Sequence, residues 1–104
     1  DNDRAALDRL ERAVETRDVL SFCYTDETGK ETERHVRPLG LWFWGKVWTL
    51  VAWCEMRDDF RTFRVDRLTR LEPAGRGFRH ERGKTLADFY RRLESRGESW
   101  SRAV

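Results

Sequence analysis

The strongest constraint in this sequence is a hairpin whose strands are apolar on both faces. The dipeptide Gly45-Lys46 separates two runs of β-branched and aromatic residues, 41–44 and 47–54, and this pattern predicts a tight turn between antiparallel strands. Paired residues of such strands share a face of the sheet. One face then carries Leu39, Leu41, Phe43, Trp48, Leu50 and Ala52. The opposite face carries Trp42, Trp44, Val47, Thr49, Val51 and Trp53.

The two apolar faces need more cover than one small sheet provides. A small barrel buries only one face of each strand in its own core, so a helix, a partner chain or a ligand must cover the second face. We expect a helix to cover part of it. Three tryptophans exceed what one helix is expected to cover in full, and Trp42, Trp44 and Trp53 are therefore a candidate homodimer interface or stacking platform.

Turn residues divide the middle of the chain into five short predicted strands. Gly29 is the expected positive-φ position of the first turn. Pro38 and Gly40 interrupt the second strand, which predicts an edge or a bulge there. The pattern is typical of a mainly β (α+β) fold, and we predict a five-stranded Sm-like, SH3-type β-barrel with an N-terminal helix and a C-terminal helix.

Two helices are predicted to flank the strands. The first has an apolar stripe at helical spacing that includes Leu10 and Val14. The second follows a loop rich in Gly and Arg and begins at Thr85-x-x-Asp88, which resembles a capping box. The expected order is a helix at 3–16, the barrel at 18–72, a loop at 73–84, a helix at 85–94 and a polar tail at 95–104, with residues 1–94 forming one domain.

The composition bounds the class of protein. A chain of 104 residues is the size of one domain, and its five Trp, six Phe and two Tyr argue against disorder although 38% of the residues are charged. No run approaches the roughly 20 apolar residues of a membrane helix, so we expect a cytoplasmic protein without a membrane partner. Because the chain begins at Asp1 without an initiator Met, we expect a processed or excised piece of a longer protein.

No pattern of catalytic or metal-binding residues stands out. Cys23 and Cys54 are far apart and lack a nearby His pair, which excludes a zinc site and favours inert thiols in a reducing cytosol. His35 has no nucleophile with a positioned base and orienter, and no Gly-rich phosphate loop is present. We therefore predict a protein that is not an enzyme and that has no cofactor and no metal.

Arginines are concentrated in one segment of the chain. Residues 1–60 carry 9 Lys and Arg against 13 Asp and Glu, a net charge of −4, whereas residues 61–104 carry 12 against 6, a net charge of +6. Four arginines fall within eleven residues: Arg57, Arg61, Arg64 and Arg67. Such a cluster suits a phosphate backbone. Pairing with neighbouring aspartates in a solvated network is the alternative, and periodicity alone favours it. Glu55 is placed to orient Arg57 or Arg61, an interpretation that weighs equally with simple exposure.

An ordered series of motifs resembles the WYL domain family. The motifs are Phe22-Cys23-Tyr24, Gly29, Val36-Arg37-Pro38-Leu39-Gly40-Leu41, Trp48 to Glu55, Arg57, and Arg61-Thr62-Phe63-Arg64-Val65-Asp66-Arg67. The resemblance runs from about Ala5 to Leu71. One departure is the signature tripeptide, Trp48-Thr49-Leu50, in which Thr replaces the middle Tyr.

WYL domains are similar to Sm-like, SH3-type β-barrels, and they usually follow a winged helix-turn-helix in bacterial transcription regulators. The resemblance implies a ligand-sensing domain that binds single-stranded DNA or RNA, or another nucleotide-like anion, and controls an attached DNA-binding regulator. The ligand-binding positions that it implies are Tyr24, Arg37, Trp48, Arg57, Arg61, Arg64 and Arg67. The chemistry agrees, because aromatic rings stack on bases while arginines hold phosphates. In any version Leu50, Phe63 and Val65 are expected in the core.

The alternative is a protein–protein dimerisation module with no small ligand of its own. In that case the arginines make only surface salt bridges, and the homodimer contact is made by the tryptophan face of the hairpin.

Overall fold

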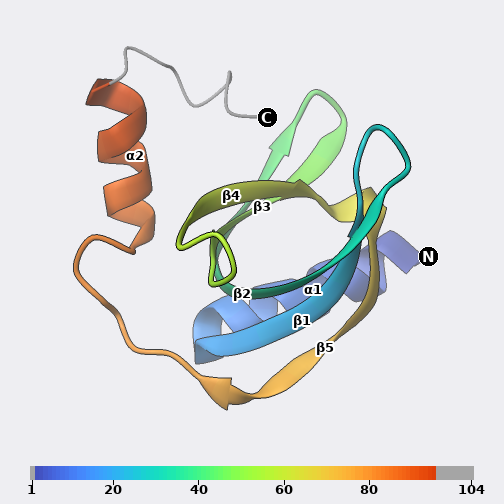
Figure 1. Ribbon diagram of the computed structural model, residues 1–104, viewed down its shortest axis with the longest axis horizontal. Helices are drawn as coiled ribbons and strands as arrows, with labels where there is room; N and C mark the ends of the chain where they lie inside the picture. Colours follow the sequence, from blue (N-terminus) through green and yellow to red (C-terminus); the bar gives the residue numbers. More distant parts are fainter. Residues whose placement is uncertain (1, 96–104) are drawn as a thin grey trace.

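The computed structural model describes residues 2–95 and contains two α-helices, five strands and one short 3-10 helix (Figure 1). The elements are α1 (Asn2–Thr16), β1 (Asp18–Thr25), β2 (Glu31–Trp44), β3 (Val47–Cys54), β4 (Asp59–Arg64), the 3-10 helix η1 (Val65–Arg67), β5 (Leu68–Gly77) and α2 (Leu86–Ser95). Both predicted helices are confirmed to within one residue at each end. The tail expected at 95–104 lies outside the described residues after Ser95.

The strands form one curled antiparallel sheet in the order β4-β3-β2-β1-β5. Figure 1 shows the strands curving around a common centre, with α2 standing outside the curl. No ladder joins β4 to β5 among residues 2–95, so the prediction of a closed barrel is wrong. The reason is that η1 makes a corner after β4, and β5 then pairs with β1 at the opposite edge of the sheet.

A side chain of β1 reaches across the curl of the sheet to β4. The hydroxyl of Tyr24, on β1, accepts a hydrogen bond of 3.2 Å from the backbone N–H of Arg64 at the end of β4. The ring of Tyr24 also meets Phe63 edge to face, with 5.0 Å between the ring centroids. The sheet therefore holds its curl near this point through Tyr24 and not through a backbone ladder.

The central hairpin has the predicted register. Trp44 pairs with Val47 and Leu41 pairs with Leu50, around a turn at Gly45 and Lys46 whose φ angles are +57° and +75°. Positive φ at both turn positions matches the twist of the flanking strands. The hairpin is therefore built by its local sequence.

The expected bulge is also present, and it changes which face one residue uses. The β2–β3 register shifts between Pro38 and Gly40, so one residue of β2 has no partner of its own. As a result Leu39 packs with the outer apolar cluster and not with the face of Leu41, where we had placed it. The assignment of Leu39 was wrong because an extra residue reverses the alternation of side chains.

The inner face of the curled sheet holds the main core. Leu10 and Ala13 of α1 pack against it, together with the aromatic pair Phe22 and Phe63, whose centroids are 5.1 Å apart. The predicted core residues Leu50, Phe63 and Val65 are confirmed, with at most 4% of each exposed. The first helix thus covers the inner face of the sheet.

The second helix covers the outer face. Phe89 and Leu93 of α2 form an apolar cluster with Val51, Trp53 and Phe60. The helix starts where the capping box predicts, because the Thr85 hydroxyl accepts from the Asp88 N–H while the Asp88 carboxylate accepts from the Thr85 N–H. This cap turns the chain into the helix at the position that brings its apolar stripe onto the sheet.

The loop predicted at 73–84 begins later than expected. β5 continues to Gly77, which pairs with Asp18, and Pro73 lies opposite Leu20. A proline is tolerated there because β5 is an edge strand and needs no second ladder. The backbone N–H of Phe78 then bonds the carbonyl of Arg17 and ends the pairing.

The first prediction compares two buried threonines, of which only one has a hydrogen-bonded hydroxyl. The hydroxyl of Thr49 is buried with no hydrogen-bond partner within residues 2–95, whereas that of Thr85 caps α2. Removing an unsatisfied buried hydroxyl is favourable, so Thr49→Val is expected to raise the free energy of unfolding by about 1 kcal/mol. Removing the cap in Thr85→Val is expected to lower it by about 1 kcal/mol.

Urea unfolding followed by tryptophan fluorescence measures both variants. Equal losses of stability in the two variants would show that the Thr49 hydroxyl has a partner in solution.

Candidate anion-binding site

The four clustered arginines follow one edge of the sheet. Arg57 lies in the turn before β4, Arg61 and Arg64 lie on β4, and Arg67 ends η1. Because β4 is an edge strand, the row lies along a border of the sheet with an unpaired backbone. The four arginines therefore follow one another along this border, although Arg61, opposite Ala52 of the inner cluster, and Arg64, opposite Thr49, start from opposite faces of the strand.

The arginines of this row differ in how their charge is balanced. Arg64 donates to both carboxylate oxygens of Asp66, at 3.1 and 2.7 Å. These hydrogen bonds hold the pKa of Asp66 below its usual range and raise that of Arg64. In contrast, Arg57 and Arg61 are exposed and make no ion pair with any residue of the described chain. The expected pairing with aspartates thus applies to Arg64, whereas Arg57, Arg61 and Arg67 make no ion pair with the described residues.

The two predicted aromatic residues lie at the same end of the row. Tyr24 contacts Arg64 through its hydroxyl, and a shallow hollow of about 320 Å³ beside it is lined by Arg67. Trp48 is 38% exposed, leans on Phe43 at 5.1 Å between centroids, and borders a smaller hollow with Asp66. A flat ring is therefore available to a ligand close to the η1 corner.

Acidic side chains also line the hollow beside Tyr24. Asp26 and Glu27 lie there with Thr28, and Asp26 accepts hydrogen bonds from Thr28 and Lys30. The Thr28 hydroxyl makes the largest contribution to the lowered pKa of Asp26. The carboxylates make this hollow a poorer place for an anion than the exposed row along β4.

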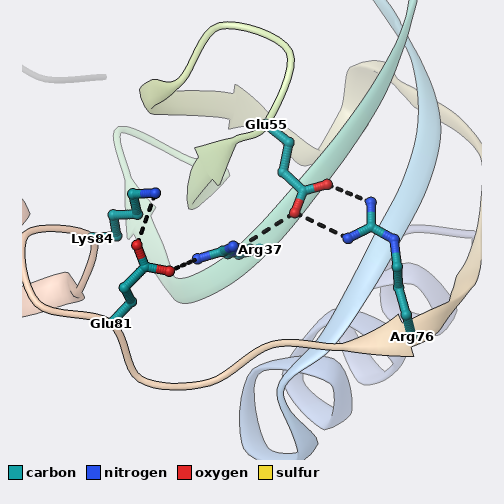
Figure 2. Close-up of polar contacts among 5 residues, drawn as sticks. All are labelled: Arg37, Glu55, Arg76, Glu81 and Lys84. Atoms are coloured by element: carbon teal, nitrogen blue, oxygen red, sulfur yellow. Dashed lines mark hydrogen bonds and ion pairs between the residues drawn. The ribbon is translucent and has the colours of Figure 1, made fainter.

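The seventh predicted residue, Arg37, is in a different environment. Its guanidinium donates to Glu55 at 3.4 Å and to Glu81 at 3.0 Å (Figure 2). It also lies 5.9 Å from the centroid of the Phe78 ring. Arg37, on β2, pairs with Trp53 near the end of β3. Arg64 pairs with Thr49 near the start of β3, so the two arginines are at opposite ends of that strand. The structure does not bring Arg37 to the η1 corner.

Arg37 belongs to a chain of five charged residues that Figure 2 shows in full. The chain runs through Lys84, Glu81, Arg37, Glu55 and Arg76. It joins β2 and the end of β3 to β5 and to the segment before α2. The expectation that Glu55 orients Arg57 or Arg61 is corrected, because its carboxylate is taken by Arg37 and Arg76.

The network also sets the protonation of its carboxylates. The hydrogen bond from Arg76 lowers the pKa of Glu55 against the opposing effect of burial, with a smaller contribution from Arg37. For Glu81 the hydrogen bond from Lys84 is the largest cause of a lowered pKa. Both groups are therefore ionised at neutral pH and fasten the outer segment to the sheet.

The tryptophan face of the hairpin is largely covered. Trp53 is 7% exposed beneath α2, with the Phe60 ring at 5.0 Å between centroids, and Trp42 packs on Tyr90 of α2. The side chain of Trp44 lies outside the described part of the structure. The open aromatic surface is instead formed by Phe43 and Trp48, next to a groove of about 730 Å³ between the hairpin and α1.

One buried arginine, Arg34, is not among the predicted site residues. Arg34 is 8% exposed and lies on β2 two residues before Val36, which is fully buried. Alternation along the strand was the signal that placed Arg34 on the inner face with Val36. A charged residue at an inward position is unusual enough to be examined as a functional group.

The described residues show no metal site, no disulfide and no membrane-spanning helix. Among residues 2–95, no group of His, Cys, Asp and Glu is arranged to hold a metal ion, and Cys23 and Cys54 are not bonded to each other. No helix in this part of the chain is long and apolar enough to cross a membrane.

Comparisons with known proteins give consistent matches. A model of the WYL domain family matches residues 5–73. YobV of Bacillus subtilis (strain 168), an uncharacterised HTH-type transcriptional regulator, is 28% identical over 71 residues, which are 68% of this chain and 23% of that protein. The solved structure of proteasome accessory factor B/C (PafBC) of Arthrobacter aurescens is similar with a TM-score of 0.68 and 31% identity, covering 73% of this chain and 12% of that one. The chain thus spans less than a quarter of either relative.

The carboxylate at the centre of the ion-pair network gives the second prediction. At neutral pH, Glu55→Gln is expected to lower the free energy of unfolding by about 1 kcal/mol, because charged hydrogen bonds to two arginines become neutral ones. The folded pKa of Glu55 is lowered, so its contribution is full above its ordinary value of 4.5 and is lost as the pH falls through the folded value. The difference between variant and parent should therefore vanish in acid.

Urea unfolding at pH 7 and at acidic pH measures this difference. Glu72→Gln, on the exposed part of β5, is the matched control and should change little at either pH. A loss that persists unchanged in acid would mean that Glu55 acts through packing and not through its charge.

Proposed function

The chain belongs to the WYL domain family, and we propose that it is the ligand-sensing regulatory domain of a longer transcription regulator. The name of its relative YobV, an HTH-type transcriptional regulator, supports the regulatory part of this proposal. In the proposed protein a winged helix-turn-helix domain binds DNA, and the WYL domain reports on a ligand. The domain binds its ligand and catalyses no reaction.

The proposed ligand is a single-stranded nucleic acid or another nucleotide-like anion. The observation that carries this choice is the pair of exposed arginines Arg57, in the turn before β4, and Arg61, on β4, neither of which pairs with a described carboxylate. Guanidinium groups bind phosphates with two parallel hydrogen bonds. Trp48, exposed at the η1 corner, supplies a ring on which a base can stack.

The alternative of a dimerisation module draws less support from the structure. That hypothesis used the surplus apolar face of the hairpin, and α2 covers much of this face by packing on Trp53 and Trp42. The arginine row, in contrast, remains open to solvent at Arg57 and Arg61. We therefore favour the ligand-binding function.

The third prediction concerns binding of a fluorescein-labelled single-stranded oligonucleotide. Arg57→Ala and Arg61→Ala are each expected to weaken binding about tenfold, because each removes a charge-assisted hydrogen bond to phosphate. Each should also reduce the slope of log K against log salt by about 0.7. Fluorescence anisotropy at several salt concentrations measures both quantities.

Arg12→Ala is the matched control for the loss of one positive charge. Arg12 is exposed on α1 and lies beside β1 and β5, at the other edge of the sheet. If all three variants bind as the parent does, the arginine row is not the binding surface. If the parent binds no oligonucleotide and Trp42→Ala changes its mass in light scattering, the dimerisation module is the better description.

A further inference from the structure

We propose that Arg34 anchors a site for a terminal phosphate group, on the inner face of the curled sheet beside Tyr24 and Arg61. The inference rests on the proposed function and adds a residue and a ligand chemistry to it. It starts from the surroundings of the Arg34 guanidinium.

The charge of Arg34 is buried without a counter-charge. Arg34 is 8% exposed, and no carboxylate of residues 2–95 forms an ion pair with it. Asp59, which lies opposite Cys54 on the neighbouring strand, is instead paired with Arg92 of α2. Burying a charge without a partner is costly, and proteins that keep such a group commonly use it in a functional site.

The contacts that Arg34 does make replace only part of its hydration. Its Nε donates to the Thr32 hydroxyl at 3.0 Å, and its Nη1 lies 3.7 Å from the Cys54 sulfur, a weak acceptor. The guanidinium carbon is 5.8 Å from the centroid of the Phe63 ring. Of the five N–H donors of an arginine, most are therefore left without an acceptor in the described chain.

The free donors are on the side of the guanidinium that solvent reaches. Nη2 makes no hydrogen bond to the described residues, yet it is not among the buried polar atoms that lack both a partner and contact with solvent, such as Thr49 Oγ1 and Tyr90 OH. The contact with solvent is small because so little of Arg34 is exposed. A small terminal group can approach a guanidinium that is so nearly covered, whereas a backbone phosphodiester is flanked by two sugars.

One residue of the proposed ligand surface, Tyr24, lies against the same aromatic ring as Arg34. Phe63 contacts both Arg34, at 5.8 Å, and Tyr24, at 5.0 Å between centroids. Arg61 is two residues before Phe63 on β4 and lies opposite Ala52, which belongs to the same inner cluster as Cys54. Tyr24 and, by strand alternation, Arg61 are therefore on the same inner face as Arg34, and the proposal takes them as the further donors to the phosphate.

A phosphate monoester fits these donors best. It carries nearly two negative charges and several acceptor oxygens, which match two guanidinium groups. The group can come from the end of a nucleic-acid strand or from a free nucleotide. The two sources share the same chemistry, and separate arms of the experiment distinguish them.

The experiment compares three probes on the whole domain: a single-stranded oligonucleotide with a 5′-phosphate, the same oligonucleotide with a 5′-hydroxyl, and a nucleoside monophosphate. The parent domain is expected to bind the 5′-phosphorylated strand about tenfold more tightly than the hydroxyl form. In Arg34→Met this preference should disappear, while the strand itself still binds through Arg57. A monophosphate that raises Tm in the parent but not in Arg34→Met identifies a free nucleotide as the source.

The stability of the variant separates a binding role from a structural one. Replacing a buried, unpaired charge by an apolar residue of similar length is neutral or stabilising, so the Tm of Arg34→Met should not fall. A variant that loses the phosphate preference together with several degrees of Tm would assign Arg34 a structural role and overturn the inference. Arg34→Lys keeps the charge without the planar fork and should retain part of the preference.

Binding by the parent domain also tests the Arg34 site. If it binds the phosphorylated and hydroxyl strands equally and ignores the monophosphate, the Arg34 site is wrong while the proposed function stands. If it binds neither strand nor the monophosphate, both fail. A preference that survives in Arg34→Met also overturns the site, because another group then reads the phosphate.

Discussion

The fold depends on the need to bury both faces of one sheet. The hairpin of β2 and β3 is apolar on both sides, and the two helices solve this by taking one face each. Leu10 and Ala13 of α1 fill the inner side, and Phe89 and Leu93 of α2 cover the outer side. With both faces covered by helices, the edges of the sheet remain for a ligand. Arg61 and Arg64 lie on one of these edges, strand β4.

The unclosed sheet explains why an edge is available at all. A closed barrel would pair β4 with a neighbour on both sides, and the arginine row would then flank a ladder. Here η1 turns the chain away after β4, and the hydroxyl of Tyr24 provides the hydrogen bond near the corner. An edge strand with charged side chains resists pairing with another chain, so the arginines have a protective effect in addition to any ligand contact.

Local patterns in the sequence predicted the elements that local forces build. The hairpin register follows from the Gly45-Lys46 turn, and the start of α2 follows from the Thr85 and Asp88 cap. The bulge was expected, but its effect on Leu39 was not followed through, although a reversal of alternation is predictable once an extra residue is accepted. The hairpin, the helix start and the bulge each depend on residues within a few positions of each other in the sequence.

Long-range contacts account for the remaining differences. Whether the sheet closes depends on the direction of the chain after η1, which local patterns do not determine. The partners of Glu55 come from β2 and β5 and cannot be read from the residues near Glu55. For the candidate site, the neighbourhood of Arg57, Arg61, Arg64 and Arg67 follows from their closeness in the sequence, whereas a shared ligand site remains a prediction, because Arg61 and Arg64 start from opposite faces of β4. The sequence did not separate Arg37 from them, because its distance from the η1 corner arises only when the sheet is assembled.

The arginines can be divided by whether a carboxylate balances them. Arg37 and Arg76 share Glu55, and this compensated group joins distant segments of the fold. Arg34, Arg57 and Arg61 have no such partner within the described chain. Ion pairing satisfies a charge inside the protein and leaves little of it for a ligand, whereas an unbalanced guanidinium gains most from an external anion. A structural arginine and a binding arginine have the same side chain and differ in whether a carboxylate of the protein already pairs with it. The positions of the carboxylates therefore indicate function more directly than the positions of the arginines.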